Sequence, residues 1–202
     1  MKKFIILSLL MTLSLTAGAQ DAALAKNVLD KTAAIVGRKG GASADFTLSS
    51  KKYGNVSGSL AIKGNMFHAK TPKSIVWYNG KTQWSYMKST NEVNVSTPTE
   101  AQQMRMNPYK FITIYRSGYN MSISDNGNSY WVHLVAQNKT RTIQELYILV
   151  NKKSYNPSQI KMRQDKDWTN ISISNFKAKN LSNSVFTFNA KDYPSSEVVD
   201  LR

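Results

Sequence analysis

Cysteine is absent from this 202-residue sequence, and histidine and acidic residues are scarce. Without cysteine the chain has no disulfide and no thiol nucleophile, and no lipid-modified cysteine can follow an export signal. His68 and His133 are the only histidines, and each stands alone in an apolar segment without metal-ligand spacing. We therefore expect no metal site and no cofactor, and a structural or solvent-facing role for both histidines.

Arrangements of residues that carry catalysis are also missing. No serine lies in a Gly-x-Ser-x-Gly turn, and residues 37–41 (Gly-Arg-Lys-Gly-Gly) lack the Gly-Lys-Ser/Thr ending of a phosphate-binding loop. The twelve acidic residues are dispersed, with no pair at an informative spacing. A small hydrolase is disfavoured on these grounds, and the sequence predicts a protein that is not an enzyme.

The first 19 residues have the pattern of a secretory signal peptide. Lys2 and Lys3 precede an apolar run over 4–15, and Ala17-Gly18-Ala19 supplies the small residues of a cleavage site. The run is shorter than the ~20 apolar residues of a membrane span, although a retained membrane anchor is the alternative interpretation. We predict a signal peptide over 1–19 and a single soluble exported domain over 20–202.

Positive charge exceeds negative charge by a wide margin. The formal net charge is +15, and removal of Lys2 and Lys3 with the signal peptide leaves +13. Such a charge favours acidic partners such as anionic headgroups or an acidic protein, and the alternative is a solvated, lysine-rich strand surface. Nucleic acid is not expected, because the chain is exported and its basic residues are scattered rather than clustered.

The pattern of apolar residues changes after a short helical segment. Residues 21–36 have a helical period that ends at Gly37, whereas alternation typical of strands begins near residue 42. Turn residues separate the predicted strands, which implies an antiparallel meander that curls into a barrel or half-barrel. The predicted strands are 44–52, 56–64, 66–69, 74–78, 81–87, 92–96, 119–124, 129–136, 142–150, 159–164, 168–176 and 185–189.

A hairpin over residues 73–86 is the most informative of these segments. Asn79-Gly80 suits a two-residue type I′ turn, which would pair Trp77 with Thr82 and Ile75 with Trp84. Alternation then places five side chains on one face: Ile75, Trp77, Thr82, Trp84 and Tyr86. Such a face is either part of a heavy core or the wall of an apolar cavity.

A second helical pattern interrupts the strands. Asn107-Pro108 has the residues of a helix start, and Phe111, Ile112 and Tyr115 follow at helical spacing, whereas 97–106 has the composition of a loop or frayed turn. The strands over 129–136 and 142–150 carry apolar residues on both faces, so that something must pack on each face. The helices look too short to fill a curved sheet, which fits an enclosed apolar cavity. A packed core without a cavity is an equal alternative on the sequence pattern alone.

Several motifs in this order resemble the LolA family of outer-membrane lipoprotein carriers. They lie across nearly the whole exported chain: Ala44-Asp45-Phe46, Gly-Ser-Leu-Ala-Ile-Lys at 58–63, Phe67, 77–86, Asn107-Pro108, Phe186-Thr187-Phe188, Tyr193-Pro194 and Val198-Val199-Asp200. The resemblance implies a mainly β (α+β) fold, an incomplete antiparallel β-barrel of about 11–12 strands with short helices lidding its concave face. Members have an arginine near the second strand that holds the lid, but this chain offers only Lys63, which lacks the planar donor fork of arginine.

The resemblance also implies a function. It predicts a monomeric periplasmic carrier that takes acylated lipoproteins as cargo from an inner-membrane ABC transporter to an outer-membrane receptor. The alternative is a lipid- or protein-sensing interaction module on the same fold. Lys63 is the candidate lid latch, and the candidates for acyl-chain contact are the residues Phe67, Ile75, Trp77, Trp84, Tyr86, Phe111, Ile112, Tyr115 and Trp131.

Overall fold

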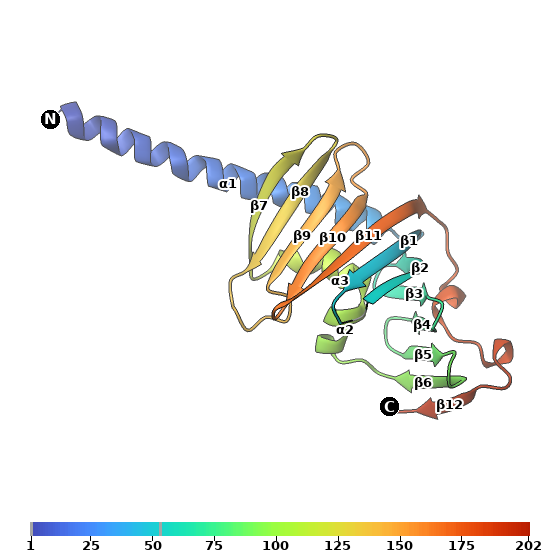
Figure 1. Ribbon diagram of the computed structural model, residues 1–202. Helices are drawn as coiled ribbons and strands as arrows, with labels where there is room; N and C mark the ends of the chain where they lie inside the picture. The colour runs from blue at the N-terminus through green and yellow to red at the C-terminus, as the bar shows by residue number, and fades with distance from the viewer. Residues whose placement is uncertain (1, 53) are drawn as a thin grey trace.

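A computed structural model of the chain describes residues 2–52 and 54–202, with side chains from Ala19 onward apart from that of residue 105. Within these residues the chain forms three α-helices, three short 3₁₀ helices and one twelve-stranded sheet (Figure 1). The helices are α1 (Lys2–Val36), α2 (Glu100–Met106) and α3 (Pro108–Thr113), and the 3₁₀ helices are η1 (Ile114–Arg116), η2 (Asn183–Phe186) and η3 (Ala190–Asp192). The strands are β1 (Ala42–Ser50), β2 (Gly54–Lys63), β3 (Met66–Lys70), β4 (Ser74–Tyr78), β5 (Gln83–Met87), β6 (Glu92–Ser96), β7 (Tyr119–Asn126), β8 (Ser129–Ala136), β9 (Glu145–Asn151), β10 (Pro157–Gln164), β11 (Asp167–Ala178) and β12 (Glu197–Asp200).

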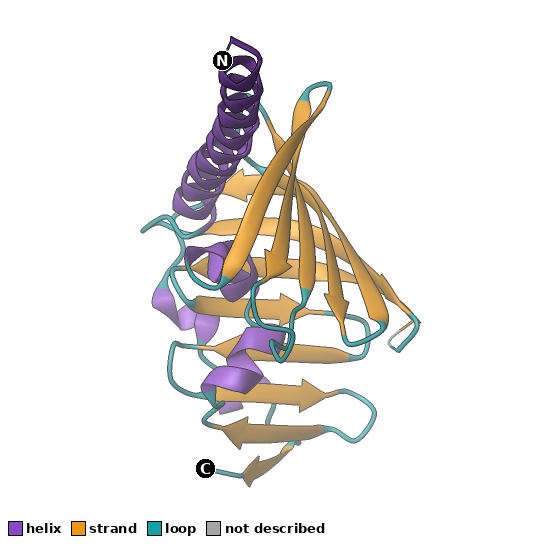
Figure 2. Ribbon diagram, turned by 90° about the vertical axis from the view of Figure 1, so that its left-hand side faces the viewer, coloured by secondary structure: helices purple, strands orange, loops and turns teal. Residues whose placement is uncertain are grey.

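The sheet is open, and its strand order is β12-β6-β5-β4-β3-β2-β1-β11-β10-β9-β8-β7. Two antiparallel meanders, β1 to β6 and β7 to β11, join where β1 pairs with β11. Helices α2 and α3 lie inside the curve of this sheet (Figure 2). The predicted incomplete barrel with short helices on its concave face is thus confirmed.

The first eleven predicted strands coincide with β1–β11, but the twelfth is wrong. Residues 183–186 form η2 instead, because the Phe186 side chain is fully buried against the sheet rather than alternating along a strand. The last strand lies further on, at β12, where it pairs in parallel with β6. A pairing between segments about 100 residues apart has no local sequence signal.

Helix α2 corrects the prediction of a loop or frayed turn over 97–106. Its N-terminus is closed by a capping box, in which the Gln102 backbone N–H donates to Thr99 Oγ1 and the Thr99 backbone N–H donates to Gln102 Oε1 at 2.8 Å. The Thr-x-x-Gln signature of that box was present in the sequence. Seven residues are enough here because the cap satisfies donors that a short helix otherwise leaves free.

The β4–β5 hairpin forms, but the predicted register is wrong by two residues. Trp77 lies opposite Trp84 and Ile75 opposite Tyr86, because the loop spans residues 79–82 rather than two residues. The Asn79 side chain closes this loop by accepting from the backbone N–H groups of Lys81 and Thr82. An even shift leaves every side chain on its original face, so the predicted aromatic face survives.

The main core lies where α1 and α3 pack against the concave face of β7–β10. The phenol of Tyr115, in η1 directly after α3, donates to Asp30 Oδ1 of α1 at 2.5 Å. Burial, together with this bond, raises the pKa of Tyr115 to about 12. The contact therefore ties α1 to the segment that follows α3.

Residues 2–18 continue α1 away from the sheet in Figure 1, and their side chains lie outside the described ones. The predicted signal peptide falls on this segment, so its cleavage stays a prediction. No helix among the described residues combines the length and the apolar composition of a membrane-spanning segment.

Candidate functional site

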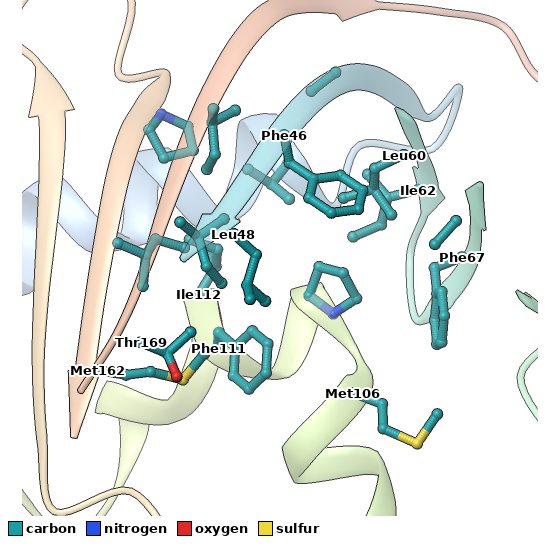
Figure 3. A pocket seen from close by; sticks show the side chains of 18 of the residues that line it. Phe46, Leu48, Leu60, Ile62, Phe67, Met106, Phe111, Ile112, Met162 and Thr169 are labelled. Atoms are coloured by element: carbon teal, nitrogen blue, oxygen red, sulfur yellow. The ribbon is translucent and has the colours of Figure 1, made fainter. Parts of the chain in front are cut away.

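An apolar pocket of about 390 Å³ lies between the concave face of the sheet and the α2–α3 segment. Its walls come from β1, β2 and β3 on one side and from β10 and β11 on the other, and α2 and α3 lie across the pocket from these strands (Figure 3). The residues labelled in Figure 3 are Phe46, Leu48, Leu60, Ile62, Phe67, Met106, Phe111, Ile112, Met162 and Thr169. The polar residues in the lining are Ser43, Asp45, Lys52, Thr142, Gln164, Asp165 and Thr169.

The volume of the pocket sets the size of a fitting ligand. A dry apolar cavity of about 150 Å³ takes one benzene, which corresponds to about 25 Å³ per carbon. The 390 Å³ pocket then has room for roughly sixteen carbons, close to one long acyl chain. In this conformation it suits a single extended apolar chain rather than a bulky polar ligand.

Close backbone approach shapes the pocket wall at Gly58. Gly58 lies directly opposite Phe46 in the β1–β2 ladder, and a Cβ at Gly58 would come within 2.9 Å of the Phe46 ring. The missing side chain therefore lets the Phe46 ring lie against the strand beside the pocket. A larger residue at this position would displace that ring.

The lid, which consists of α2 and α3, is held to the sheet by Asn107, a fully buried residue between the two helices. Its Nδ2 donates to the Asn65 carbonyl in the β2–β3 turn at 2.8 Å, and its Oδ1 accepts from the Tyr109 backbone N–H at 3.0 Å. One side chain thus caps α3 and fixes its start to the sheet. We refer to Asn107 as the lid anchor.

We expect Asn107→Ala to loosen the lid and to lower the free energy of unfolding by about 1–3 kcal/mol, because it leaves buried donors and acceptors without partners. Hydrogen exchange of the α2 and α3 amides should accelerate more than that of β8 and β9. Asn128→Ala, in the exposed β7–β8 turn, is the control and should change neither quantity, because the Asn128 side chain forms no hydrogen bond with another described residue. Equal exchange rates in the lid of Asn107→Ala and wild type would contradict this role.

Lys63, the candidate lid latch, contacts a different element. Its Nζ donates to the Leu181 carbonyl at 2.7 Å and to Asn183 Oδ1 at 2.8 Å. These bonds fix the segment that follows β11 rather than the lid. The hydrogen bond to the lid is made two residues later, where the Asn65 carbonyl accepts from Asn107 Nδ2.

Three of the nine candidate ligand contacts line the pocket. Phe67 lies in its β3 wall, and Phe111 and Ile112 face it from α3. Tyr115 is buried next to α1 instead, through its bond to Asp30. Trp131 lies on the convex face of β8, on the opposite side of the sheet.

The aromatic face of the β4–β5 hairpin also lies on the convex side. Phe67 and His68 are neighbours along β3, so His68 and its cross-strand partner Trp77 point away from the pocket. The C-terminal segment covers this face, with Phe188 and Tyr193 at 5.5 and 5.6 Å from the Trp77 ring. The candidates on this face pack under that segment rather than around the pocket: Ile75, Trp77, Trp84 and Tyr86.

The His68 side chain lies within this layer on the convex face. Its ring stacks on Trp77 at 5.3 Å, and its Nε2 is buried with no hydrogen-bond partner among the described residues. Burial, with a smaller contribution from Lys70, lowers the pKa of His68. The ring is therefore neutral at pH 7, as the structural role predicted for it requires.

Pocket residues that were not singled out from the sequence lie mainly on β1, β2 and β11. Phe46 and Leu48 alternate with small polar residues along β1, and Ile171 and Ile173 do the same along β11. This period of two was a sufficient signal for one apolar face. Most of the aromatic residues predicted to contact the ligand lie elsewhere, and the pocket is lined largely by aliphatic side chains.

Within the described residues, no group of three or more His, Cys, Asp or Glu side chains is placed to hold a metal ion. The pocket lining contains no histidine. Its arrangement offers apolar burial beneath a cover of two short helices.

A protein-family model described as outer membrane lipoprotein carrier protein LolA matches residues 15–166. A search of curated protein sequences returned no match. Among solved structures, an uncharacterised conserved protein from Thermus thermophilus aligns with a TM-score of 0.59 at 12% identity, over 87% of this chain and 98% of that one. A LolA superfamily protein from Nitrosomonas europaea aligns with a TM-score of 0.45 at 12% identity, over 81% of this chain and 97% of that one. The complex of MucA and MucB from Pseudomonas aeruginosa aligns with a TM-score of 0.44 at 6% identity, over 83% of this chain and 62% of that one.

Proposed function

Because the chain belongs to the LolA family of outer membrane lipoprotein carriers, we propose that it carries lipoproteins across the periplasm with an acyl chain held in its pocket. In this proposal the chain is exported by the signal peptide over 1–19 and works as a soluble monomer. An inner-membrane ABC transporter supplies the acylated cargo, and an outer-membrane receptor accepts it. The protein binds and releases its cargo without chemical change.

The observation that carries the proposal is the pocket itself. It is apolar, it has the volume of about one acyl chain, and its cover is two short helices rather than a continuous part of the sheet. A carrier needs a site that opens, since ligands of this length do not pass through a packed wall. Helix α2 contacts α3, whereas α3 packs on α1 and the core of β7–β10 and is bonded to the β2–β3 turn through Asn107; α2 is therefore the part of the lid with the fewest contacts to break on opening.

The energetics favour reversible binding. Transfer of each methylene out of water contributes about 0.8 kcal/mol, so that sixteen carbons give a gross gain of roughly 13 kcal/mol. Lid rearrangement and the ordering of a flexible chain oppose this gain. The net affinity is then low enough for transfer to a receptor that binds the chain more tightly.

Native mass spectrometry of the protein isolated from the periplasm tests the proposal. We expect one-to-one complexes with acylated lipoproteins, and transfer of the cargo to outer-membrane vesicles in a reconstituted assay. A protein that carries no acylated species and displaces no apolar dye would contradict acyl binding. Stable lipid binding without transfer would contradict the carrier and support the sensing module.

A further inference from the structure

A second hollow, of about 330 Å³, lies on the convex face of β7–β10. Its lining includes Ser122, Ser124, Trp131, His133, Tyr147 and Lys161. Four of these form one row across neighbouring strands, because Ser122 lies opposite His133, His133 opposite Tyr147, and Tyr147 opposite Lys161. Ile148 and Met162, next to Tyr147 and Lys161 in sequence, point to the opposite, concave face, so the hollow is separate from the acyl pocket.

Two aromatic rings form a corner in this hollow. The rings of Trp131 and Tyr147 are nearly perpendicular, at 88° with centroids 6.3 Å apart. The His133 ring stacks on Tyr147 at 4.0 Å, which covers one face of the phenol. Rigid aromatic walls at right angles suit a compact ring rather than an extended chain.

Glu145 holds the Tyr147 and His133 rings in place. It accepts from Tyr147 Oη at 3.0 Å and from Arg163 Nε at 3.0 Å, and it is paired with His133 Nε2 at 2.9 Å. Burial acts to raise the pKa of Glu145, but these hydrogen bonds outweigh it and the pKa is lowered. The carboxylate is thus ionised and already engaged by three partners.

Three polar groups around the corner have no hydrogen-bond or ion-pair partner within the described part of the chain. The Lys161 ammonium lies 5.1 Å from the centre of the Trp131 ring, and no carboxylate among the described residues pairs with it. The hydroxyls of Ser122 and Ser124 likewise form no side-chain hydrogen bond with another described residue. A cation and two hydroxyls therefore converge on a hollow with aromatic walls.

We propose that this hollow binds a six-membered sugar ring that carries an acidic group, either a carboxylate or a phosphate. The C–H face of such a ring is weakly positive and packs on the negative face of an indole or phenol. Its hydroxyls pair with Ser122 and Ser124, and its acid pairs with Lys161. At about 25 Å³ per heavy atom, 330 Å³ corresponds to roughly thirteen atoms, the size of one acidic monosaccharide.

Titration of the full exported chain by calorimetry and by tryptophan fluorescence tests this site. The probes are glucuronic acid and glucose 6-phosphate, with glucose as the neutral ring and inorganic phosphate as the bare anion. We expect saturable binding of at least one acidic sugar with a dissociation constant of about 1 mM, and about tenfold weaker binding of glucose and of phosphate. Which acid binds more tightly distinguishes a uronic acid source from a sugar phosphate source.

Lys161→Gln should weaken the acidic sugar about tenfold, to the level of glucose, while leaving binding of a fatty-acid probe unchanged. Lys153→Gln, an exposed lysine in the β9–β10 turn, is the matched control and should bind as wild type does. Trp131→Phe should weaken both the acidic and the neutral ring. The proposal is overturned if neither acidic sugar saturates, if Lys161→Gln binds them as wild type does, or if inorganic phosphate binds as tightly as they do.

Discussion

We expect Ala69→Trp to abolish detectable binding of a sixteen-carbon fluorescent fatty acid, with at least a ~100-fold loss of affinity. Ala69 lines the pocket from β3, beside Leu60 of β2. An indole at this position adds nine heavy atoms, which fill more than half of the 390 Å³ at about 25 Å³ per atom. About eight methylenes would then stay in water, and each contributes about 0.8 kcal/mol to binding when it is buried. Their lost contribution exceeds the ~2.7 kcal/mol of binding free energy to which a hundredfold loss of affinity corresponds.

The matched control for this change is Ser59→Trp. Ser59 is exposed on β2, next to Leu60 but on the convex face of the sheet. It introduces the same side chain into the same region without entering the pocket, so the affinity should stay within twofold of wild type. Thermal unfolding of both variants verifies that each is folded. Unchanged binding by Ala69→Trp would place the acyl chain elsewhere.

Phe186→Ala is expected to lower the free energy of unfolding by about 3–5 kcal/mol, the range for a fully buried phenylalanine. The Phe186 ring has no solvent exposure and lies in η2, against β3 and β4. Its loss leaves a cavity beneath the segment that covers His68 and Trp77. The substitution should therefore destabilise the whole domain, and it should also let this segment detach from the sheet more readily.

Urea denaturation measures the stability of this variant, and limited proteolysis within residues 179–196 measures release of the segment. Leu201→Ala, at a side chain that is 62% exposed, is the control and should change stability by less than about 0.5 kcal/mol. A loss of under 1 kcal/mol for Phe186→Ala would show that the C-terminal segment contributes little to the fold.

Local patterns were reliable wherever the physical cause was local. Alternation along β1–β11 gave the strands, and Asn107-Pro108 gave the start of α3, because pleat and capping depend on neighbouring residues. The Thr99–Gln102 capping box is local in the same sense, and its Thr-x-x-Gln pattern is a sufficient sequence signal for the start of α2. The loop length at Asn79 was predicted wrongly. Asn-Gly suggested a two-residue turn, but the Asn79 side chain closes a longer loop over residues 79–82.

The candidate site was predicted less well, and the reason is the curvature of the sheet. Trp77 and Phe67 are both large, apolar and buried, yet they point to opposite faces. Which face becomes a pocket depends on what covers it, and only the three-dimensional arrangement decides that. On the convex side the cover is Phe186, Phe188 and Tyr193 from the C-terminal segment, and on the concave side it is α2 and α3.

The sequence by itself therefore determined the class of fold, the positions of most strands and the lid helix, and the family to which the chain belongs. The strands and the lid helix follow from periodicity, caps and turn residues, which act over a few neighbouring positions, whereas the family was indicated by the resemblance of an ordered set of motifs. The tertiary structure alone decided that the aromatic hairpin packs under the C-terminal segment, that Asn107 anchors the lid, and that Lys63 holds a different element. Each of these is a contact between segments more than 40 residues apart, and the sequence carries no local record of such contacts.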